Sequence, residues 1–151
     1  MLKQKLKFIY GVGEKQFRKY YTISYNKKGN TGELLLQLLE SRLDNVVFRL
    51  GYARTRAEAR MQVSHGAFQV NGQKVDIPSY IVKPGDEIAV REIRKDNGTI
   101  KASVEETASR LVPTWLEKNI DNLSGKVVKE PSREEIDYPV EEHLIVELYS
   151  K

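Results

Sequence analysis

The chain has 151 residues, of which 40% are hydrophobic and 30% are charged, a balance typical of a folded globular protein and too apolar for a disordered one. It contains no cysteine, which excludes disulfides and thiolate metal sites, and its two histidines offer little for a metal. No stretch resembles a membrane span or a secretory signal. We therefore expect a cytoplasmic protein without a cofactor.

The net charge of +4 hides an asymmetry between the two halves of the chain. Residues 1–75 contain 14 Lys+Arg and 5 Asp+Glu, a balance of +9, whereas residues 76–151 contain 11 and 16, a balance of −5. The basic half predicts a polyanionic partner. A membrane surface would require an amphipathic helix with an exposed apolar face, but the apolar faces here are needed for a core. Nucleic acid is favoured instead.

The first part of the chain predicts helices. A short apolar patch at residues 6–9 precedes a glycine-containing break, and residues 14–24 then follow a helical period. The aromatic side of that segment can serve a core or stack on unpaired bases, and it carries Phe17, Tyr20, Tyr21 and Tyr25. Thr31 is the expected N-cap of a third helix, in which leucines recur at three and four residues up to Leu39.

Two further helices are predicted between residues 41 and 66. Ser41, followed by Asp44, indicates the start of the first, which should end at Gly51. Its outward face is expected to carry Arg42, Asn45 and Arg49. Thr55 and Glu58 form a capping box that begins the second, and Gly66 should end it. Its exposed ridge, with a spacing of four residues, is expected to carry Arg56, Arg60 and Ser64.

Beyond Gly66 the pattern changes to strands. Asn71-Gly72 predicts a two-residue hairpin that pairs Val70 with Gln73 and Gln69 with Lys74. A type II turn at 83–86 and a strand at 87–91 complete a small antiparallel sheet packed on helices, which is an α+β fold. Weaker patterns predict a helix at 100–111, a buried Trp115, a last strand at 126–128, a connector at 130–138 and a terminal helix near 143–150.

No catalytic constellation emerges. The glutamate pairs at 105–106, 134–135 and 141–142 are adjacent in sequence, so their side chains diverge rather than converge on a substrate. Gly11-Val12-Gly13 follows a helix-like segment and lacks the rest of a phosphate-loop fingerprint. The cations are more informative, because Glu58 is the one carboxylate between residues 45 and 76, where several arginines and Lys74 occur. Clustered like charges repel, and a phosphate backbone offsets that cost.

SRLDNVVFRLGYARTRAEARMQVSHGAFQVNG, followed by VKPGDEI, closely resembles the RNA-binding domain named after the fourth protein of the small ribosomal subunit. The flanking YGVGEKQFRKYY, PTWLE and EEHLIVELYSK resemble the bacterial ribosomal family itself over essentially the whole chain. Members of that family usually begin with roughly forty to fifty more residues, basic and in some bacteria zinc-binding, so by this resemblance the chain lacks an N-terminal arm and its metal.

The resemblance implies two domains. A helical domain would comprise residues 1–41 and about 136–151 and would enclose an RNA-binding domain at 42–135, with a core motif at 42–91. It also implies direct binding to small-subunit ribosomal RNA, nucleation of the assembly of its five-prime domain, neighbouring ribosomal proteins as partners, and in some members repression of their own messenger RNA.

The resemblance also implies the residues of the RNA surface. In the RNA-binding domain these are Arg42, Asn45, Arg49, Arg54, Thr55, Arg56, Arg60, His65 and Lys74. In the helical domain they are Lys15, Gln16, Arg18, Lys19, Lys27 and Lys28. His65 can equally serve as a cation at the end of its helix. Two alternatives use the same domain, an RNA-modifying enzyme and a free ribosome-associated factor, but the first needs a catalytic domain and the second should lack these flanks.

Overall fold

The computed structural model describes residues 2–27 and 29–132. These divide into two units, the first with the described residues up to 40 and Ser132, and the second with residues 41–131. The proposed return of residues 136–151 to the first unit lies outside the described part, as do the expected terminal helix and His143.

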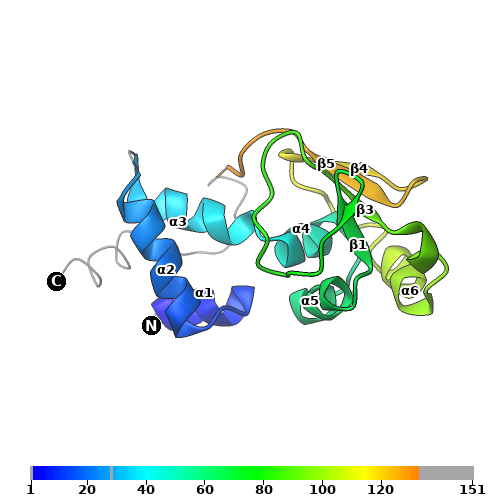
Figure 1. Cartoon of the computed structure of the whole chain (residues 1–151), viewed down its shortest axis with the longest axis horizontal. Coiled ribbons are helices and arrows are strands. Elements are labelled where there is room, and N and C mark those ends of the chain that lie inside the picture. The colour runs from blue at the N-terminus through cyan, green and yellow to red at the C-terminus, as the bar shows by residue number, and fades with distance from the viewer. Residues whose placement is uncertain (1, 28, 133–151) are drawn as a thin grey trace. The chain divides into compact units, whose positions relative to one another are not determined.

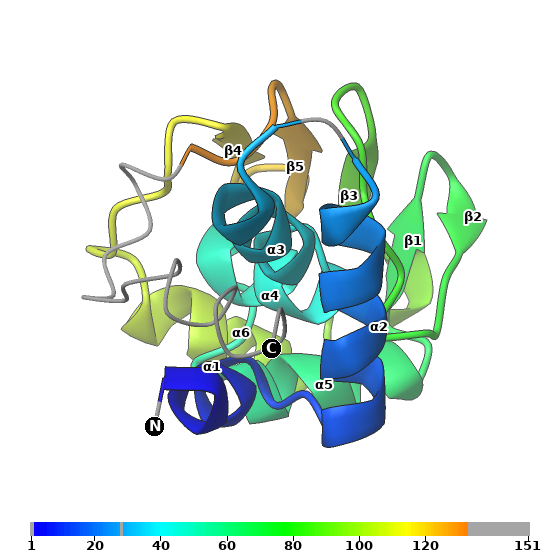
Figure 2. The same cartoon turned by 90° about the vertical axis from the view of Figure 1, so that its left-hand side faces the viewer.

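Three helices form the first unit: α1 (Leu2–Tyr10), α2 (Glu14–Tyr25) and α3 (Thr31–Glu40). Figure 2 shows α2 and α3 side by side, with α1 near one end of α2. The aromatic side of α2 is buried at Phe17, Tyr20 and Tyr21, as its use in the core requires, whereas Tyr25 is exposed. The N-cap expected at Thr31 is wrong by one residue, because the Asn30 side chain accepts the Glu33 N–H at 3.1 Å.

A buried polar contact joins the first and last helices of this unit. The Tyr10 hydroxyl of α1 donates to the Glu40 carboxylate of α3, and both side chains are almost fully buried. A buried carboxylate is costly unless hydrogen bonds stabilise it, so this pair fixes how α1 and α3 meet.

The second unit is α+β, as predicted. Its helices are α4 (Leu43–Leu50), α5 (Arg56–Ser64) and α6 (Gly98–Glu106), with a 3-10 turn η1 (Glu92–Arg94) before α6. Its strands are β1 (Phe68–Val70), β2 (Gln73–Lys74), β3 (Glu87–Val90), β4 (Leu116–Asn119) and β5 (Ser124–Val127). Figure 1 shows α4 and α5 next to each other beside the sheet.

The sheet is antiparallel throughout, in the order β2-β1-β3-β5-β4. The predicted hairpin register is confirmed, with Gln69 opposite Lys74 and Val70 opposite Gln73. Asn71 and Gly72 have φ of 51° and 83°, the left-handed conformation that a type I′ turn requires. The turn at 83–86 is also confirmed: the Asp86 N–H donates to Lys83 O, and φ of Gly85 is 97°.

Helix α4 packs closely against β5. A Cβ atom on Gly125 would lie 2.5 Å from a methyl group of Leu50, so only glycine fits at this point of the strand. Trp115 is buried in the same core, as predicted, together with Val127. The last strand is confirmed, β4 was not foreseen, and α6 ends five residues before the expected Leu111.

Candidate nucleic-acid interface

Helix α5 begins at the predicted N-cap Thr55, with one of the two bonds of the expected capping box. Thr55 is the N-cap, and its hydroxyl accepts the Glu58 N–H at 3.0 Å. The Glu58 carboxylate returns to the Arg54 N–H at 2.9 Å, and it also accepts the Ser103 hydroxyl from α6. The first bond satisfies a donor that the helix start leaves open, and the second ties the residue before the N-cap to the first turn, so together they set the position of the basic residues along α5.

Arg54 is neutralised within the protein, which corrects the expectation of a cation without carboxylates. Its guanidinium lies 2.9 Å from Glu58 and 3.2 Å from Glu106 of α6. The hydrogen bonds with these two carboxylates raise the pKa of Arg54. Burial alone would raise the pKa of Glu58, but the hydrogen bonds from Arg54 and Ser103 outweigh it and the pKa is lowered.

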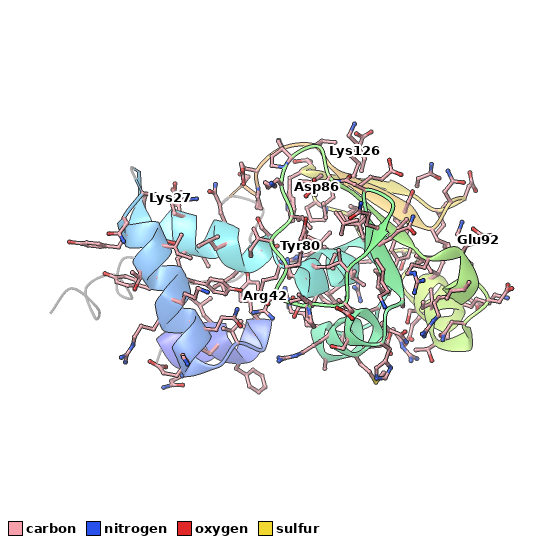
Figure 3. The ribbon with its side chains drawn as sticks, in the orientation of Figure 1. Lys27, Arg42, Tyr80, Asp86, Glu92 and Lys126 are labelled. Atoms are coloured by element: carbon pink, nitrogen blue, oxygen red, sulfur yellow. The ribbon has the colours of Figure 1, made fainter. Side chains whose placement is uncertain are left out.

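The predicted outward face of α4 is wrong at two of its three residues. Arg42 and Asn45 are 1% and 0% exposed. The Arg42 guanidinium binds both carboxylate oxygens of Asp44, at 3.1 and 3.0 Å, and Figure 3 shows it beside Tyr80. Because Arg42 is the N-cap residue and the Leu43 N–H donates to Tyr80 O, the loop before β3 caps α4 in place of the expected Ser41.

Three guanidiniums gather around the half-buried ring of Phe48 at the end of α4. The Cζ atoms of Arg56, Arg110 and Arg49 lie 4.4, 4.7 and 5.9 Å from the ring centroid. Arg56 Nε also donates to Asn45 Oδ1 at 2.8 Å, so the buried Asn45 orients an arginine of the candidate surface. Cation–π contacts of this kind hold the planar groups against the ring.

Arg110 comes from the segment after α6. Its Nη1 donates to Phe48 O at 3.0 Å and its Nη2 to Arg54 O at 3.2 Å. Burial, and then the like charges of Arg49 and Arg56, lower the pKa of Arg110. Nearby, the Lys118 ammonium lies 5.4 Å from the Tyr52 ring centroid, and burial followed by the charge of Arg110 lowers its pKa. We call Arg49, Arg56 and Arg110 the Phe48 cluster.

A second group of cations lies at the carboxyl end of α5. Arg91 Nη1 donates to Gly66 O at 2.9 Å, and Arg94 Nη2 donates to His65 O at 2.8 Å. His65 and Lys74 are both exposed there, and a Cβ on Gly66 would lie 3.5 Å from the Lys74 side chain. Cations at this end are favoured by the helix dipole, so both roles expected of His65 stay open.

The remaining candidates of the second unit lie on the outside of α5. Arg60 and Ser64 are exposed and Arg56 is half-buried, so the predicted ridge is present. In the first unit the candidates lie on α2 and just after it. Lys15, Arg18, Lys19 and Lys27 are exposed, Gln16 is half-buried, and Lys28 is outside the described residues. Arg18 lies 3.6 Å from Glu14.

Three cations of this surface were missed from the sequence: Arg91, Arg94 and Arg110. Each is separated from α5 by a turn or by α6, and Arg110 follows the acidic pair Glu105-Glu106, a context that indicates an ordinary solvated helix end. The pairing of the sheet strands and the position of α6 bring them to α5, so no local signal was available.

This arrangement favours anion recognition. Guanidinium groups offer planar pairs of N–H donors that match phosphate oxygens. Among residues 2–27 and 29–132, no group of three His, Asp or Glu side chains is placed to hold a metal. In the same ranges, every helix is too short or too polar to cross a bilayer.

Comparison with known proteins agrees with the division into a first unit at residues 1–40 and a second unit that begins at residue 41. Residues 41–88 match the S4 domain, and residues 1–40 match the Ribosomal protein S4/S9 N-terminal domain. Small ribosomal subunit protein uS4 of Thermoanaerobacter sp. (strain X514) is 60% identical over 149 residues, which are 99% of this chain and 71% of that protein. The proteins of the same name from Lachnospira eligens and Natranaerobius thermophilus are 58% and 56% identical, again over 99% of this chain, and 76% and 71% of their own lengths are covered.

The chain is therefore an S4-domain protein with a ribosomal type of N-terminal domain. The chain belongs to the family of small ribosomal subunit protein uS4.

Proposed function

We propose that this chain is a structural constituent of the small ribosomal subunit, that it binds the subunit's ribosomal RNA directly, and that it nucleates assembly of the five-prime domain. The observation that supports this most is the collection of cations at both ends of α5, the Phe48 cluster at one end and His65, Lys74, Arg91 and Arg94 at the other. They come from five separate segments, which points to a built surface rather than to one solvated helix face.

The mechanism is recognition and not catalysis. Helix α5 has nine residues and is therefore about 13 Å long, enough to place its two ends against different phosphates of a folded RNA. Side chains cannot read the deep groove of A-form RNA, so a rigid array of cations selects the shape of the backbone. Release of counterions from the phosphates supplies much of the affinity.

Neighbouring ribosomal proteins, and the chain's own messenger RNA, are further proposed partners. The acidic half of the chain supports a protein neighbour, because a hollow of about 490 Å³ at β4 and β5 is lined by Glu87, Glu117 and Asp121 together with lysines. Carboxylates repel a phosphate backbone, so this part of the second unit suits a basic protein surface better than RNA.

Replacement of Arg60 by glutamine tests the RNA surface. Arg60 is exposed on the middle of α5, so its loss should leave the fold intact, weaken binding to a five-prime-domain transcript and reduce the salt slope of log K by about 1. The control is Lys126→Gln, which removes an equal charge from β5, where the side chain extends away from the ribbon in Figure 3. The affinity for the transcript and the salt slope should both stay at wild-type values in Lys126→Gln.

Co-sedimentation of the tagged chain with mature small subunits tests its place in the ribosome. Stable association after a high-salt wash is expected of a structural constituent. Release into the free fraction, with RNA binding retained, would support the free ribosome-associated factor instead.

A further inference from the structure

The Phe48 ring is a surface against which arginine side chains of the same protein pack. It is partly buried against the core of the second unit, so it cannot swing freely. Two guanidiniums, those of Arg56 and Arg110, lie within 5 Å of its centroid, at 4.4 and 4.7 Å. Because they cover the ring, a nucleotide base cannot stack on it. The ring therefore orients charge and does not bind a base.

Arg110 is tethered at the backbone of two other segments. Its bonds to Phe48 O and Arg54 O use two of the five N–H groups that a guanidinium carries. Three donors remain on a group whose position is already fixed. Such preorganisation lowers the entropy lost when a ligand binds.

The cluster brings three like charges together at the end of α4. Three guanidiniums lie within 6 Å of one ring centroid. The carboxylate that offsets the charge of Arg110, Glu106, also forms the 3.2 Å ion pair with Arg54. Burial lowers the pKa of Arg110, and the repulsion from Arg49 and Arg56 lowers it further. An anion held between them would remove that repulsion.

We propose that Arg110, with Arg49 and Arg56 around Phe48, forms a binding site for one phosphodiester group of the RNA. This inference rests on the proposed function, and it adds a residue that lies outside the S4-domain match at 41–88. A phosphodiester has two oxygens that accept pairs of N–H donors, which is the geometry that guanidiniums complement. Arg110 thus contacts the ligand and also holds the end of α4 to the start of α5.

The test compares Arg110→Gln with Lys101→Gln in the full chain. Lys101 lies on α6, is 62% exposed and pairs loosely with Asp96, so the control removes the same charge from a nearby helix. With a five-prime-domain transcript, Arg110→Gln should bind about tenfold more weakly at moderate salt, and its salt slope should fall by about 1. Lys101→Gln should match the wild type in both. Equal slopes for Arg110→Gln and the wild type would overturn the proposal.

Arg110→Lys and a spectroscopic measurement separate contact from structure. The lysine variant keeps the charge but loses the planar pair of N–H donors of the guanidinium. Its salt slope should therefore stay near the wild-type value while its affinity for the transcript falls several-fold. In the wild-type chain, the Nε–H resonance of Arg110 should shift when a short RNA hairpin of the five-prime domain is added. No shift at saturation would refute a contact even where the variants fold poorly.

Inorganic phosphate distinguishes the source of the anion. It should shift the same resonance only at far higher concentration than the hairpin does. An equal response would indicate a general anion site and overturn the assignment to RNA. If the wild type fails to bind the transcript at all, the proposed function fails, whereas wild-type binding with an unaltered Arg110→Gln slope removes only this site.

Discussion

At the scale of single residues, the arginines fall into two classes that the sequence does not separate. Arg42 and Arg54 are used inside the protein, by Asp44 in one case and by Glu58 with Glu106 in the other. Arg56 and Arg110 are held against an aromatic ring. Only the second arrangement keeps N–H donors oriented for a ligand. Substitutions in the first class should therefore change the free energy of unfolding, and those in the second class should change the affinity for RNA.

Glu58→Gln tests the internal class. The glutamine keeps the shape of the side chain but loses the charge that pairs with Arg54, so we expect about 1 kcal/mol less free energy of unfolding at pH 7. The folded-state pKa of Glu58 is lowered, so its contribution is present above the unfolded-state value of 4.5 and disappears as the pH falls through the folded-state pKa.

Urea unfolding of both chains at pH 7 and at successively lower pH measures this difference. Glu105→Gln is the control, because Glu105 is exposed on the same helix as Glu106. A deficit in Glu58→Gln that persisted undiminished at pH 3 would contradict the electrostatic origin.

At the scale of elements, α4 packs on β5 with no room for a side chain at Gly125. In Gly125→Ala the new methyl group would lie 2.5 and 2.7 Å from the Leu50 methyls and 3.1 Å from Glu117 O. Leu50 is fully buried and cannot move aside, so we expect a loss of about 1–3 kcal/mol in the free energy of unfolding.

Thermal unfolding monitored by circular dichroism measures this effect. Gly98→Ala is the matched control, because a Cβ on Gly98, the first residue of α6, would meet no atom within 4 Å. If the two alanine variants melted together, the packing of α4 on β5 would have to be looser than described.

The elements that the sequence predicted well are those fixed by local chemistry. The Thr55 N-cap of α5, the Asn71-Gly72 hairpin and the turn at Gly85 each depend on a few adjacent residues, and all were predicted correctly. Strand β4 has the sequence LEKN, which carries little strand preference, and only its pairing with β5 makes it a strand.

The features that the sequence predicted incorrectly depend on contacts between distant segments. Helix α6 ends at Glu106, where the Thr107 hydroxyl donates to Gly51 O, 56 residues away. The burial of Arg42 likewise depends on the loop before β3, which supplies Tyr80 O to the start of α4. Periodicity shows which face of a helix is polar, but it does not show whether another segment covers that face.

At the scale of the whole molecule, the uneven distribution of charge predicts a preference for branched RNA. Exposed cations occur on α2 of the first unit and on α5 of the second. A branched RNA presents backbones in several directions, so both groups of cations can bind phosphates at once. We expect a three-way junction to bind several-fold more tightly than a duplex with the same number of phosphates.

A competition assay at a fixed salt concentration compares the two RNAs. Fixing the salt concentration is essential, since phosphate contacts alone change affinity steeply with ionic strength. Identical competition curves would argue against simultaneous engagement of α2 and α5.

The position of β5 in the sheet has a consequence for synthesis of the chain. Strand β3 lies between β1 and β5, and β5 is made last. At about 5–20 residues per second, a translating ribosome needs several seconds to extend the nascent chain from the β1–β2 hairpin to β5. During that interval β5 is not yet available to pair with the edge of β3 or to pack against the side of Leu50 that faces Gly125. Arg110 is synthesised only near the end of the interval. A nascent chain should therefore complete its RNA-binding surface late in synthesis and in one step.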